Sequence, residues 1–501
     1  MTLRLPPIGR TLPWFILVLI GKLLLAAFFI SQSAKYLPET INEAGITITK
    51  DYGELLGPVD NYFEHGLYSI DPESGISYTG RLPGYSFPYL VLQSLFSSNI
   101  ALILLIIFQL MLSALATVRI SQCIYGISLK RSFFIVTLFL VGFLFYSVAW
   151  ETWTYAESFA LSAWLLAVYH FYKSWGSARW WHFLLAGLFM AWAFFLRGFL
   201  GVYYLAFGFA FIWQWFKTKQ RRRLMIQFVF FILPLFVFES AWVIRNKVST
   251  GKVILLQSSF GWGDADDAYS IDKAYKPSML SLRGLIACWG GDNVHFYPGS
   301  DMSYFTMRDD PGSFFPFRPE IFSEQIQPDT LVHLRSLVQT SFNKDLELSE
   351  RIKADKSLKA KTERLTDEFR ASRPLYYFGM ASIYKLKNLC LQNVVGNWPG
   401  PSFSASSIPY KTFKLAALFV YFAGILLGII SCIWLVMRKN TSVIFHLLWM
   451  STVLLIFSFC FLINTAEFKY FMTGAVNLSL IALVGLAELL SLQRRKRTES
   501  I

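Results

Sequence analysis

The sequence predicts an all-α polytopic membrane protein, with a helical bundle of about ten spans and a mixed, mostly helical extracytoplasmic insert. Of its 501 residues, 54% are hydrophobic and only 16% are charged, which leaves too few charges to cover soluble domains of that size. Phenylalanine supplies 48 residues and tryptophan 16, a content that suits lipid-facing helices with aromatic residues at the membrane surface. Several apolar runs also approach the roughly 20 residues that a helix needs to cross the hydrocarbon core.

Ten apolar runs qualify as membrane spans or nearly so. They cover residues 13–32, 99–119, 131–149, 156–173, 180–196, 198–216, 225–243, 412–437, 443–463 and 468–491. An even number of spans places both termini on the same side of the membrane. The first run follows Arg4 and Arg10 and has no small-residue cleavage site after it, which favours a retained signal anchor over a cleaved signal peptide.

Basic residues predict which side is cytoplasmic. Much of the excess behind the formal net charge of +14 lies in short segments beside apolar runs, chiefly 217–223 and 494–497. Such clusters mark cytoplasmic loops more often than nucleic-acid-binding surfaces. We therefore expect both termini in the cytoplasm and the other face of the bundle to be extracytoplasmic.

Three regions follow from this span count. Residues 1–243 form a seven-span module with a first external loop at 33–98, residues 244–411 form the extracytoplasmic insert, and residues 412–501 form three more spans and a basic cytoplasmic tail. The run 84–97 is apolar but short, so we interpret it as a re-entrant or juxtamembrane helix. If it crossed the membrane, the sidedness of every later loop would reverse.

The signatures of soluble enzymes are missing from the sequence. It has no P-loop, no GxGxxG, no GxSxG elbow and no HExxH, and its cytoplasmic loops are too short for a nucleotide site. Its five cysteines show neither CxxC nor Cys/His spacing, so no metal centre is expected from them. Cys288 and Cys390 both fall in the insert, where they could pair in an oxidising compartment. Any catalysis is therefore expected on the external face.

The first external loop is the most informative stretch. It reads DYGELLGPVDNYFEHGLYS from Asp51 to Ser69 and RLPGY from Arg81 to Tyr85. A carboxylate, a Tyr/His/Gly turn and a cation therefore lie close to the membrane plane. The alternative interpretation is ordinary loop polarity, with proline and glycine marking turns.

This loop resembles the first external loop of the family 39 type of GT-C glycosyltransferases, which include protein O-mannosyltransferases and lipid A aminoarabinose transferases. The resemblance continues along nearly the whole chain. Similar segments are TYAESF at 154–159, AGLFMAWAFFLRG at 186–198, WVIRN at 242–246 and EFKYF at 467–471. The chain departs from the family pattern at Tyr52, where serine is common, at Lys469, where arginine is usual, and at Phe471–Met472, where proline would follow.

The resemblance implies a GT-C-like helical bundle and a membrane glycosyltransferase, which we expect in a bacterial inner (plasma) membrane. Such an enzyme moves a hexose or pentose from a polyprenyl-phosphate-linked donor to an acceptor hydroxyl on a glycan, lipid or protein, usually with inversion. A physical argument agrees, because nucleotide sugars are charged and cytosolic, so an external active site needs its sugar delivered on a membrane lipid. The expected partners are this donor, the acceptor and membrane lipids, and no nucleic acid.

Asp51 is the candidate general base, since a carboxylate beside the acceptor hydroxyl can take its proton; its alternative role is a helix N-cap. Glu157 is the second candidate catalytic residue, which could position the acceptor, assist Asp51 or bind a divalent cation, or simply favour a helix N-terminus. Candidate ligands of the donor phosphate are Arg81, Arg197, Arg245 and Lys469, with snorkelling at the interface as the alternative. Candidate substrate-lining residues are His65, Tyr68, Tyr85, Asn246 and Tyr470.

Two other classes of function stay open. A lipid-linked saccharide flippase or transporter would place ionisable residues and broken helices near the midplane, often in repeated halves. Here the candidate charges lie at external span ends, and Lys22, the one conspicuous charge within a span, has no assigned role. A noncatalytic scaffold that uses the insert for protein contacts would leave the loop motifs unexplained.

Overall fold

The computed structural model describes the whole chain apart from residues 1–5, 50, 76, 145, 178, 257–278, 294–299, 307–316, 392–402, 405, 439–441, 463–467 and 500–501. The described residues are mostly helical and include no β-strand; two isolated bridges join Thr47 to Ile41 and to Trp153. The protein is an all-α polytopic membrane protein, as the sequence predicts.

Seven helical segments of the described chain are long and apolar enough to cross a membrane. Four are single helices: α1 (Thr11–Tyr36), α5 (Ser98–Ser128), α10 (Arg221–Thr250) and α16 (Ile408–Met437). Three join a helix to a short turn: η5 (Gly198–Val202) with α9 (Tyr203–Lys217), α17 (Val443–Phe457) with η9 (Ser458–Leu462), and η10 (Phe468–Phe471) with α18 (Met472–Glu499).

The other three expected spans are also helical, but each falls short of that length or hydropathy. The helix α6 (Arg131–Phe139) runs on into η3 (Leu140–Leu144), and α8 (Trp180–Leu196) has 17 residues. The 22-residue helix α7 (Ala156–Ser177) is long enough, yet most of its side chains are buried inside the bundle. A helix packed among other helices can carry serine and other polar residues that lipid would disfavour. The total of ten spans stays a prediction.

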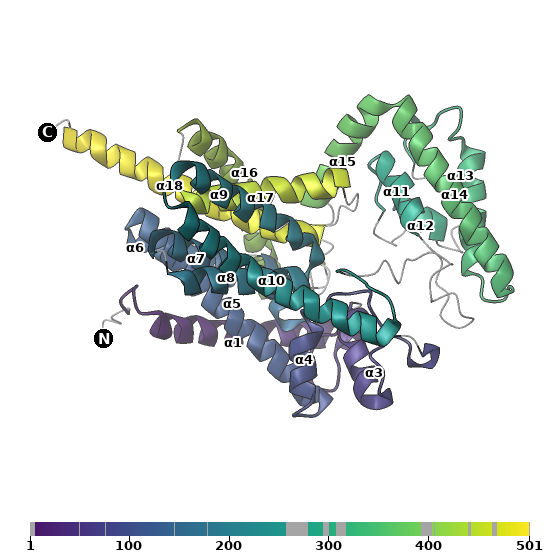
Figure 1. Ribbon diagram of the computed structural model, residues 1–501, viewed down its shortest axis with the longest axis horizontal. Helices are drawn as coiled ribbons and strands as arrows, with labels where there is room; N and C mark the ends of the chain where they lie inside the picture. Colours follow the sequence, from purple (N-terminus) through teal and green to yellow (C-terminus); the bar gives the residue numbers. More distant parts are fainter. Residues whose placement is uncertain are drawn as a thin grey trace.

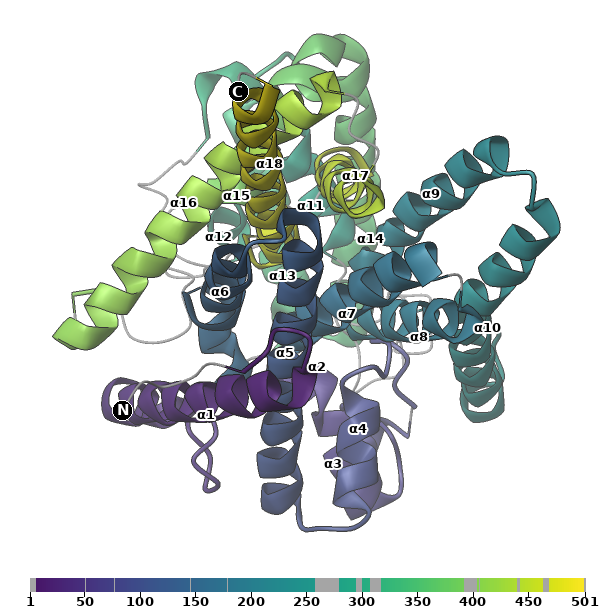
Figure 2. The same ribbon diagram turned by 90° about the vertical axis from the view of Figure 1, so that its left-hand side faces the viewer.

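The bundle is built around α5, α7 and α8, which lie side by side (Figures 1 and 2). The helix α1 packs along α5, α10 packs on α8, and α16 to α18 cover another side. The close contact between the two helices α16 and α18 depends on Gly424 and Gly428. A Cβ at Gly428 would lie only 2.4 Å from the carbonyl oxygen of Leu478 in α18. Small residues spaced four apart are a common way for membrane helices to meet.

The insert has a hydrophobic core of its own, formed by side chains such as Leu282, Leu334 and Leu358. Its helices are α11 (Leu280–Cys288), α12 (Asp301–Thr306), α13 (Pro328–Phe342), α14 (Leu348–Ser372) and α15 (Ala381–Leu391). The first four stand beyond one end of the bundle, and α15 leads back towards it (Figure 1). Both helices that flank the insert are longer than expected, since α10 continues past residue 243 and α16 begins before residue 412. Cys288 and Cys390 are free thiols, so they form no disulfide here.

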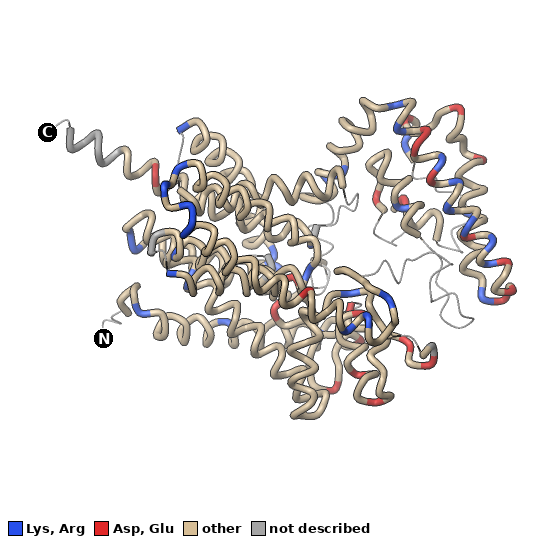
Figure 3. Tube along the Cα trace, viewed as in Figure 1, with Lys and Arg blue, Asp and Glu red and all other residues tan. Residues whose placement is uncertain are grey.

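Charge is distributed unevenly along the bundle (Figure 3). Lys and Arg, with few Asp or Glu among them, gather at the end where both chain termini lie, whereas the opposite end and the insert carry both signs. This is the distribution that a cytoplasmic basic end would give. The run 84–97 contains α4 (Ser86–Gln93), whose 8 residues span only about 12 Å, too short to cross the membrane.

A topology reporter fused after Arg131 is expected to report a cytoplasmic location, because α1 and α5 are the two spans that the described residues before it contain if α4 does not cross. A matched fusion after Gly75, in the first external loop, is expected to report the opposite side. Paired phosphatase and fluorescent-protein fusions measure both. An extracytoplasmic signal after Arg131 would contradict the proposed orientation.

Candidate functional site

Three predicted site residues from distant parts of the chain form one ion-pair cluster. Asp51 directly precedes α2 (Tyr52–Leu55), Glu157 lies in the first turn of α7, and Arg197 directly follows α8. Nη2 of Arg197 donates hydrogen bonds to Oδ2 of Asp51 at 3.1 Å and to Oε2 of Glu157 at 2.6 Å. Although Asp51 occupies the N-cap position of α2, its side chain makes no capping hydrogen bond. Its carboxylate is used for the cluster instead.

Lys469, in η10, brings the C-terminal region into the same cluster. Its Nζ lies 3.6 Å from Oδ2 of Asp51. Both Lys469 and Arg197 also lie over the ring of Tyr155, at 5.6 Å and 6.0 Å from its centroid, where the electron-rich face attracts cations. Tyr470 stacks on Phe459 with ring centroids 5.0 Å apart, and so holds the backbone beside Lys469. The glutamate at 467 that opens this motif is outside the described residues.

Arg81 joins the cluster with a partner that sequence reasoning missed. Its Nε and Nη2 donate to the same oxygen of Glu54, at 2.9 Å and 2.7 Å. Glu54 follows Asp51 by three residues, so the two carboxylates lie on neighbouring positions of one helical turn. The three-residue spacing between Asp51 and Glu54 was the sequence feature that could have identified this partner. Arg81 is close enough to help lower the pKa of Asp51.

Gly84 of the RLPGY motif fastens the Arg81 segment to the end of α8. Its amide donates to the carbonyl of Phe195 at 3.1 Å, and its own carbonyl accepts from Nε1 of Trp192 at 3.0 Å. A Cβ at this position would lie 2.3 Å from the carbonyl carbon of Phe195. Only glycine permits this approach, which sets Arg81 beside the cluster around Arg197.

The Gly84→Ala variant is expected to lose about 1–3 kcal/mol of stability, because the added methyl group overpacks against backbone that cannot move away alone. Displacement of Arg81 should also reduce any activity of the site. Gly53→Ala is the matched control, since a Cβ there meets no atom within 4 Å. Unfolding of both purified variants measures the difference; equal stability of the two would show that the close approach is not required.

A strand-like contact fixes the segment that leads into Asp51. Thr49 donates from its hydroxyl to the carbonyl of Thr154 at 2.9 Å, and its amide donates to the hydroxyl of Thr154 at 3.0 Å. The amide of Thr154 in turn donates to the carbonyl of Thr47 at 3.2 Å. Because Thr154 lies three residues before Glu157, these bonds hold the two carboxylates in register.

The cluster has a buried inner part and a more exposed outer part. The side chains of Glu157 and Arg197 are 2% and 4% exposed, whereas those of Lys469, Asp51 and Arg81 are 15%, 22% and 32% exposed. Arg197 is therefore too deeply buried to be an interfacial arginine that reaches into water. Burial alone would raise the pKa of Asp51, but Lys469, Arg197 and Arg81 together hold this pKa below its usual range. Asp51 is a carboxylate at neutral pH.

Two buried polar atoms in the inner part make no hydrogen bond with the residues that the structure describes: Oε1 of Glu157 and Nε of Arg197. An unmet buried donor or acceptor costs about 1–3 kcal/mol. The two carboxylates are a poor site for a divalent cation, because the guanidinium of Arg197 lies between them and its positive charge would repel the ion. Among the described residues, no cluster of three or more His, Cys, Asp or Glu side chains offers another metal site.

Arg245 lies outside this cluster, against a different part of the first external loop. Its guanidinium donates to the carbonyl of Tyr78 at 2.8 Å and to the hydroxyl of Ser77 at 2.7 Å. It also packs between the rings of Tyr68 and Trp242, at 4.8 Å and 5.0 Å from their centroids. These contacts tie the loop to α10, so Arg245 and Tyr68 support the site rather than face it.

The remaining predicted lining residues also differ in whether they lie near the cluster. Asn246 is buried and accepts a hydrogen bond from Arg245 at 2.9 Å. His65 is exposed and lies 3.8 Å from the carboxylate of its sequence neighbour, apart from the cluster. Tyr85 is fully buried, with its hydroxyl 3.5 Å from Oε1 of Gln109, and lies close enough to Glu157 for that charge to raise its pKa further beyond the effect of burial.

A second buried ion pair explains the lysine within the first span. Nζ of Lys22 lies 2.8 Å from both carboxylate oxygens of Glu151 and donates to the carbonyl of Gly142 at 2.9 Å. Ser113 donates to the same carboxylate at 2.6 Å. Glu151 belongs to η4 (Tyr146–Thr152), which runs directly into the segment that holds Asp51 in place. Through Lys22 and Ser113, Glu151 therefore connects α1 and α5 to the segment that supports the candidate site.

Comparison with protein-family models, with curated proteins and with solved structures found no match for this chain. The assignment of the site therefore depends on the residues themselves, which bring three distant regions of the chain together around one carboxylate.

Proposed function

We propose that this protein is an inverting membrane glycosyltransferase that moves a sugar from a polyprenyl-phosphate-linked donor to an acceptor hydroxyl on the extracytoplasmic face. The observation that carries the proposal is the Asp51 carboxylate, held between Arg197 and Lys469. Lys469 lies in η10, which contacts α15 of the insert. An ionised carboxylate beside cations is the combination that this transfer needs, because it uses a base and a site for a leaving phosphate.

We assign different roles to the cations of the cluster according to how exposed each one is. Arg81 and Lys469 are the more exposed, and we assign the donor phosphate to them. Guanidinium and ammonium groups stabilise the charge that develops on a departing phosphate oxygen. Arg197 is buried and committed to two carboxylates, so it positions Asp51 and Glu157 and neutralises them.

Donor binding would also turn Asp51 into a better base. In the free protein, the neighbouring cations hold its pKa below the usual range, which makes it a weak proton acceptor. A phosphodiester that draws Lys469 and Arg81 to itself removes part of this stabilisation and raises the pKa. Proton transfer from the acceptor is then favoured only when the donor is in place.

The transfer itself is a balanced displacement at the anomeric carbon. Asp51 takes the proton of the acceptor hydroxyl as its oxygen forms a bond to that carbon. The bond from the carbon to the phosphate oxygen breaks, its electron pair stays on the oxygen, and polyprenyl phosphate leaves beside Arg81 and Lys469.

A lipid-linked saccharide flippase is the second candidate, favoured by the buried charges of Lys22 and Glu151 inside the bundle. In that ion pair, however, the ammonium already contacts both oxygens of the carboxylate and a backbone carbonyl. It is better suited to holding helices together than to moving a substrate past them.

The two candidates differ in whether the donor is consumed. Purified protein in lipid nanodiscs would be incubated with a panel of polyprenyl-phosphate sugars and with membranes from a deletion strain as the source of acceptor. Mass spectrometry would then quantify free polyprenyl phosphate and newly glycosylated products. A transferase releases polyprenyl phosphate in proportion to product; an intact donor throughout, despite correct folding, would count against the proposal.

Arg81→Ala is expected to raise the KM for the donor about 10- to 100-fold, the loss typical of a charge-assisted hydrogen bond. The KM for the acceptor should change little. Arg81→Lys is the matched control, because it keeps the charge and should recover part of the donor affinity. If the alanine variant responds to donor concentration like the wild type, Arg81 does not bind the phosphate.

A further inference from the structure

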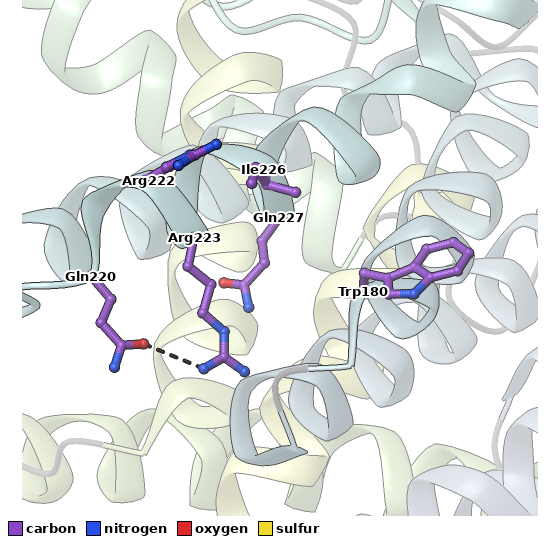
Figure 4. A pocket seen from close by; sticks show the side chains of 6 residues that line it. All are labelled: Trp180, Gln220, Arg222, Arg223, Ile226 and Gln227. Carbon is purple, nitrogen blue, oxygen red and sulfur yellow. Dashed lines mark hydrogen bonds between the residues drawn. The ribbon is translucent and has the colours of Figure 1, made fainter.

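A pocket of about 470 Å³ lies at the opposite end of the bundle from the Asp51 cluster. It is formed between the first turns of α8 and α10 and is lined by Trp180, Gln220, Arg222, Arg223, Ile226 and Gln227 (Figure 4). The helix α8 begins at Trp180 and ends beside Arg197, so its 17 residues separate the pocket from the cluster by about 25 Å. The pocket therefore cannot belong to the proposed active site.

The pocket is lined by both polar and apolar side chains. Arg223 and Gln227 are one helical turn apart and point to the same side (Figure 4), and Nη1 of Arg223 donates to Oε1 of Gln220 at 3.3 Å. Further along the helix, Phe230 packs on Trp180 with ring centroids 4.9 Å apart. Two arginines in the same pocket as an exposed tryptophan and an exposed isoleucine match a molecule with an anionic head and an apolar tail.

Four of the five cations in the basic segment 217–223 form two pairs with different surroundings. Lys217 lies over the ring of Trp213 at 4.2 Å, and Arg221 lies over the ring of Trp215 at 5.4 Å, so both are held by aromatic residues of α9. Arg222 and Arg223 line the pocket instead. If the segment served only to mark the cytoplasmic side, its two pairs of cations would not need different surroundings.

We propose that the pocket binds the phosphate headgroup of an anionic phospholipid such as phosphatidylglycerol. Two adjacent arginines provide the planar donors that match phosphate oxygens, and α10 begins here without a side-chain cap, which leaves its first amides for an anion. Basic pockets between spans at the membrane surface are suited to such headgroups.

The two apolar lining residues are the reason to choose a lipid over a soluble phosphate compound. Trp180 and Ile226 are 53% and 47% exposed, and they continue the pocket towards the lipid-facing surface of α8 and α10. An acyl chain would cover them, whereas a soluble phosphate would leave them in water. The exposed tryptophan is also typical of the level at which headgroups lie.

Native mass spectrometry of the full-length protein tests this proposal with two probes of equal chain length, phosphatidylglycerol and phosphatidylcholine. The wild type is expected to retain phosphatidylglycerol at least about 10-fold better. The double variant Arg222→Gln/Arg223→Gln should lose most of this preference. The matched control Lys217→Gln/Arg221→Gln removes the same charge from the same segment and should keep it. Trp180→Ala should weaken retention although both arginines remain.

Three results would overturn the proposal. Equal retention of the two lipids by the wild type would show that no anionic site exists. Equal loss in the two double variants would show that the segment acts only through its general charge. Competition by glycerol 3-phosphate as strong as that by the lipid would assign the pocket to a soluble phosphate compound. Thermal unfolding of each variant ensures that the comparison is made between folded proteins.

Discussion

Replacing Asp51 with asparagine is expected to abolish sugar transfer, lowering kcat by about 10²- to 10⁴-fold, the usual contribution of a general base. Asparagine has the same shape and can still accept a hydrogen bond from Arg197, so the protein should remain folded and inserted. It cannot take up a proton from the acceptor. Loss of the negative charge also leaves Arg197 and Lys469 with less neutralisation, so the KM for the donor should stay unchanged or fall.

This combination of a lower kcat and an undiminished donor affinity separates a base from a structural residue. A residue that only held the loop in place would weaken donor binding as well. Glu64→Gln is the matched control, because it removes one exposed carboxylate from the same external loop and should transfer sugar normally. Steady-state kinetics with both substrates measure the effect, and full activity of the asparagine variant would end the assignment of Asp51 as the base.

Replacing Lys22 with methionine is expected to destabilise the protein by about 3–5 kcal/mol, because removal of one partner leaves the other charge of a buried pair uncompensated. The side chains of Lys22 and Glu151 are 0% and 5% exposed, so water cannot solvate the remaining carboxylate. The loss should extend to activity, since Glu151 lies in the segment that supports Thr154 and thereby the Asp51 loop.

Two further variants identify the cause of that loss. Lys22→Met/Glu151→Leu removes both charges and should recover most of the stability, as apolar replacement of a buried ion pair often does. Lys35→Met, in the exposed last turn of the same helix, should have little effect. Titration of unfolding with a denaturing detergent compares the three proteins. A Lys22→Met variant as stable as the wild type would show that this pair does not hold the helices together.

The positions of the helices could be predicted from the sequence, because apolar length is the property that a membrane selects. Helices occur at all ten expected runs, and seven of them are supported as spans. Prediction is harder for α7, because a helix surrounded by protein is not required to be apolar throughout. The separate core of the insert was also not evident, since its apolar residues are interrupted by turns and charged positions.

Sidedness predicted which charges share a membrane face but not which of them meet. Asp51 and Arg197 are 146 residues apart in the sequence. The bonds between Thr49 and Thr154, just before α7, and the packing of α7 against α8 together bring them into contact. Arg245 was expected at the same face as Asp51, and its partners there are Tyr78 and Ser77 of the first external loop instead of the Asp51 cluster. Contact depends on the rotation of each helix about its axis, and a count of spans does not contain that information.

The residues that sequence reasoning missed act as partners of the predicted ones. Glu54 neutralises Arg81, Tyr155 lies beneath two cations, and Glu151 pairs with Lys22. A buried or half-buried charge needs a counter-charge, so the existence of such partners could be inferred. Their identity could not, because the sequence offers several acidic residues for each cation.

The most direct test of the proposed function is mass spectrometry of surface glycoproteins and glycolipids in a deletion strain that carries either the wild-type gene or the Asp51→Asn variant. We expect the deletion to remove a sugar from an extracytoplasmic acceptor, the wild type to restore it, and the variant to be present in the membrane without restoring it. Restoration by Asp51→Asn, or a set of surface glycans unchanged by the deletion, would contradict a glycosyltransferase that uses Asp51 as its base.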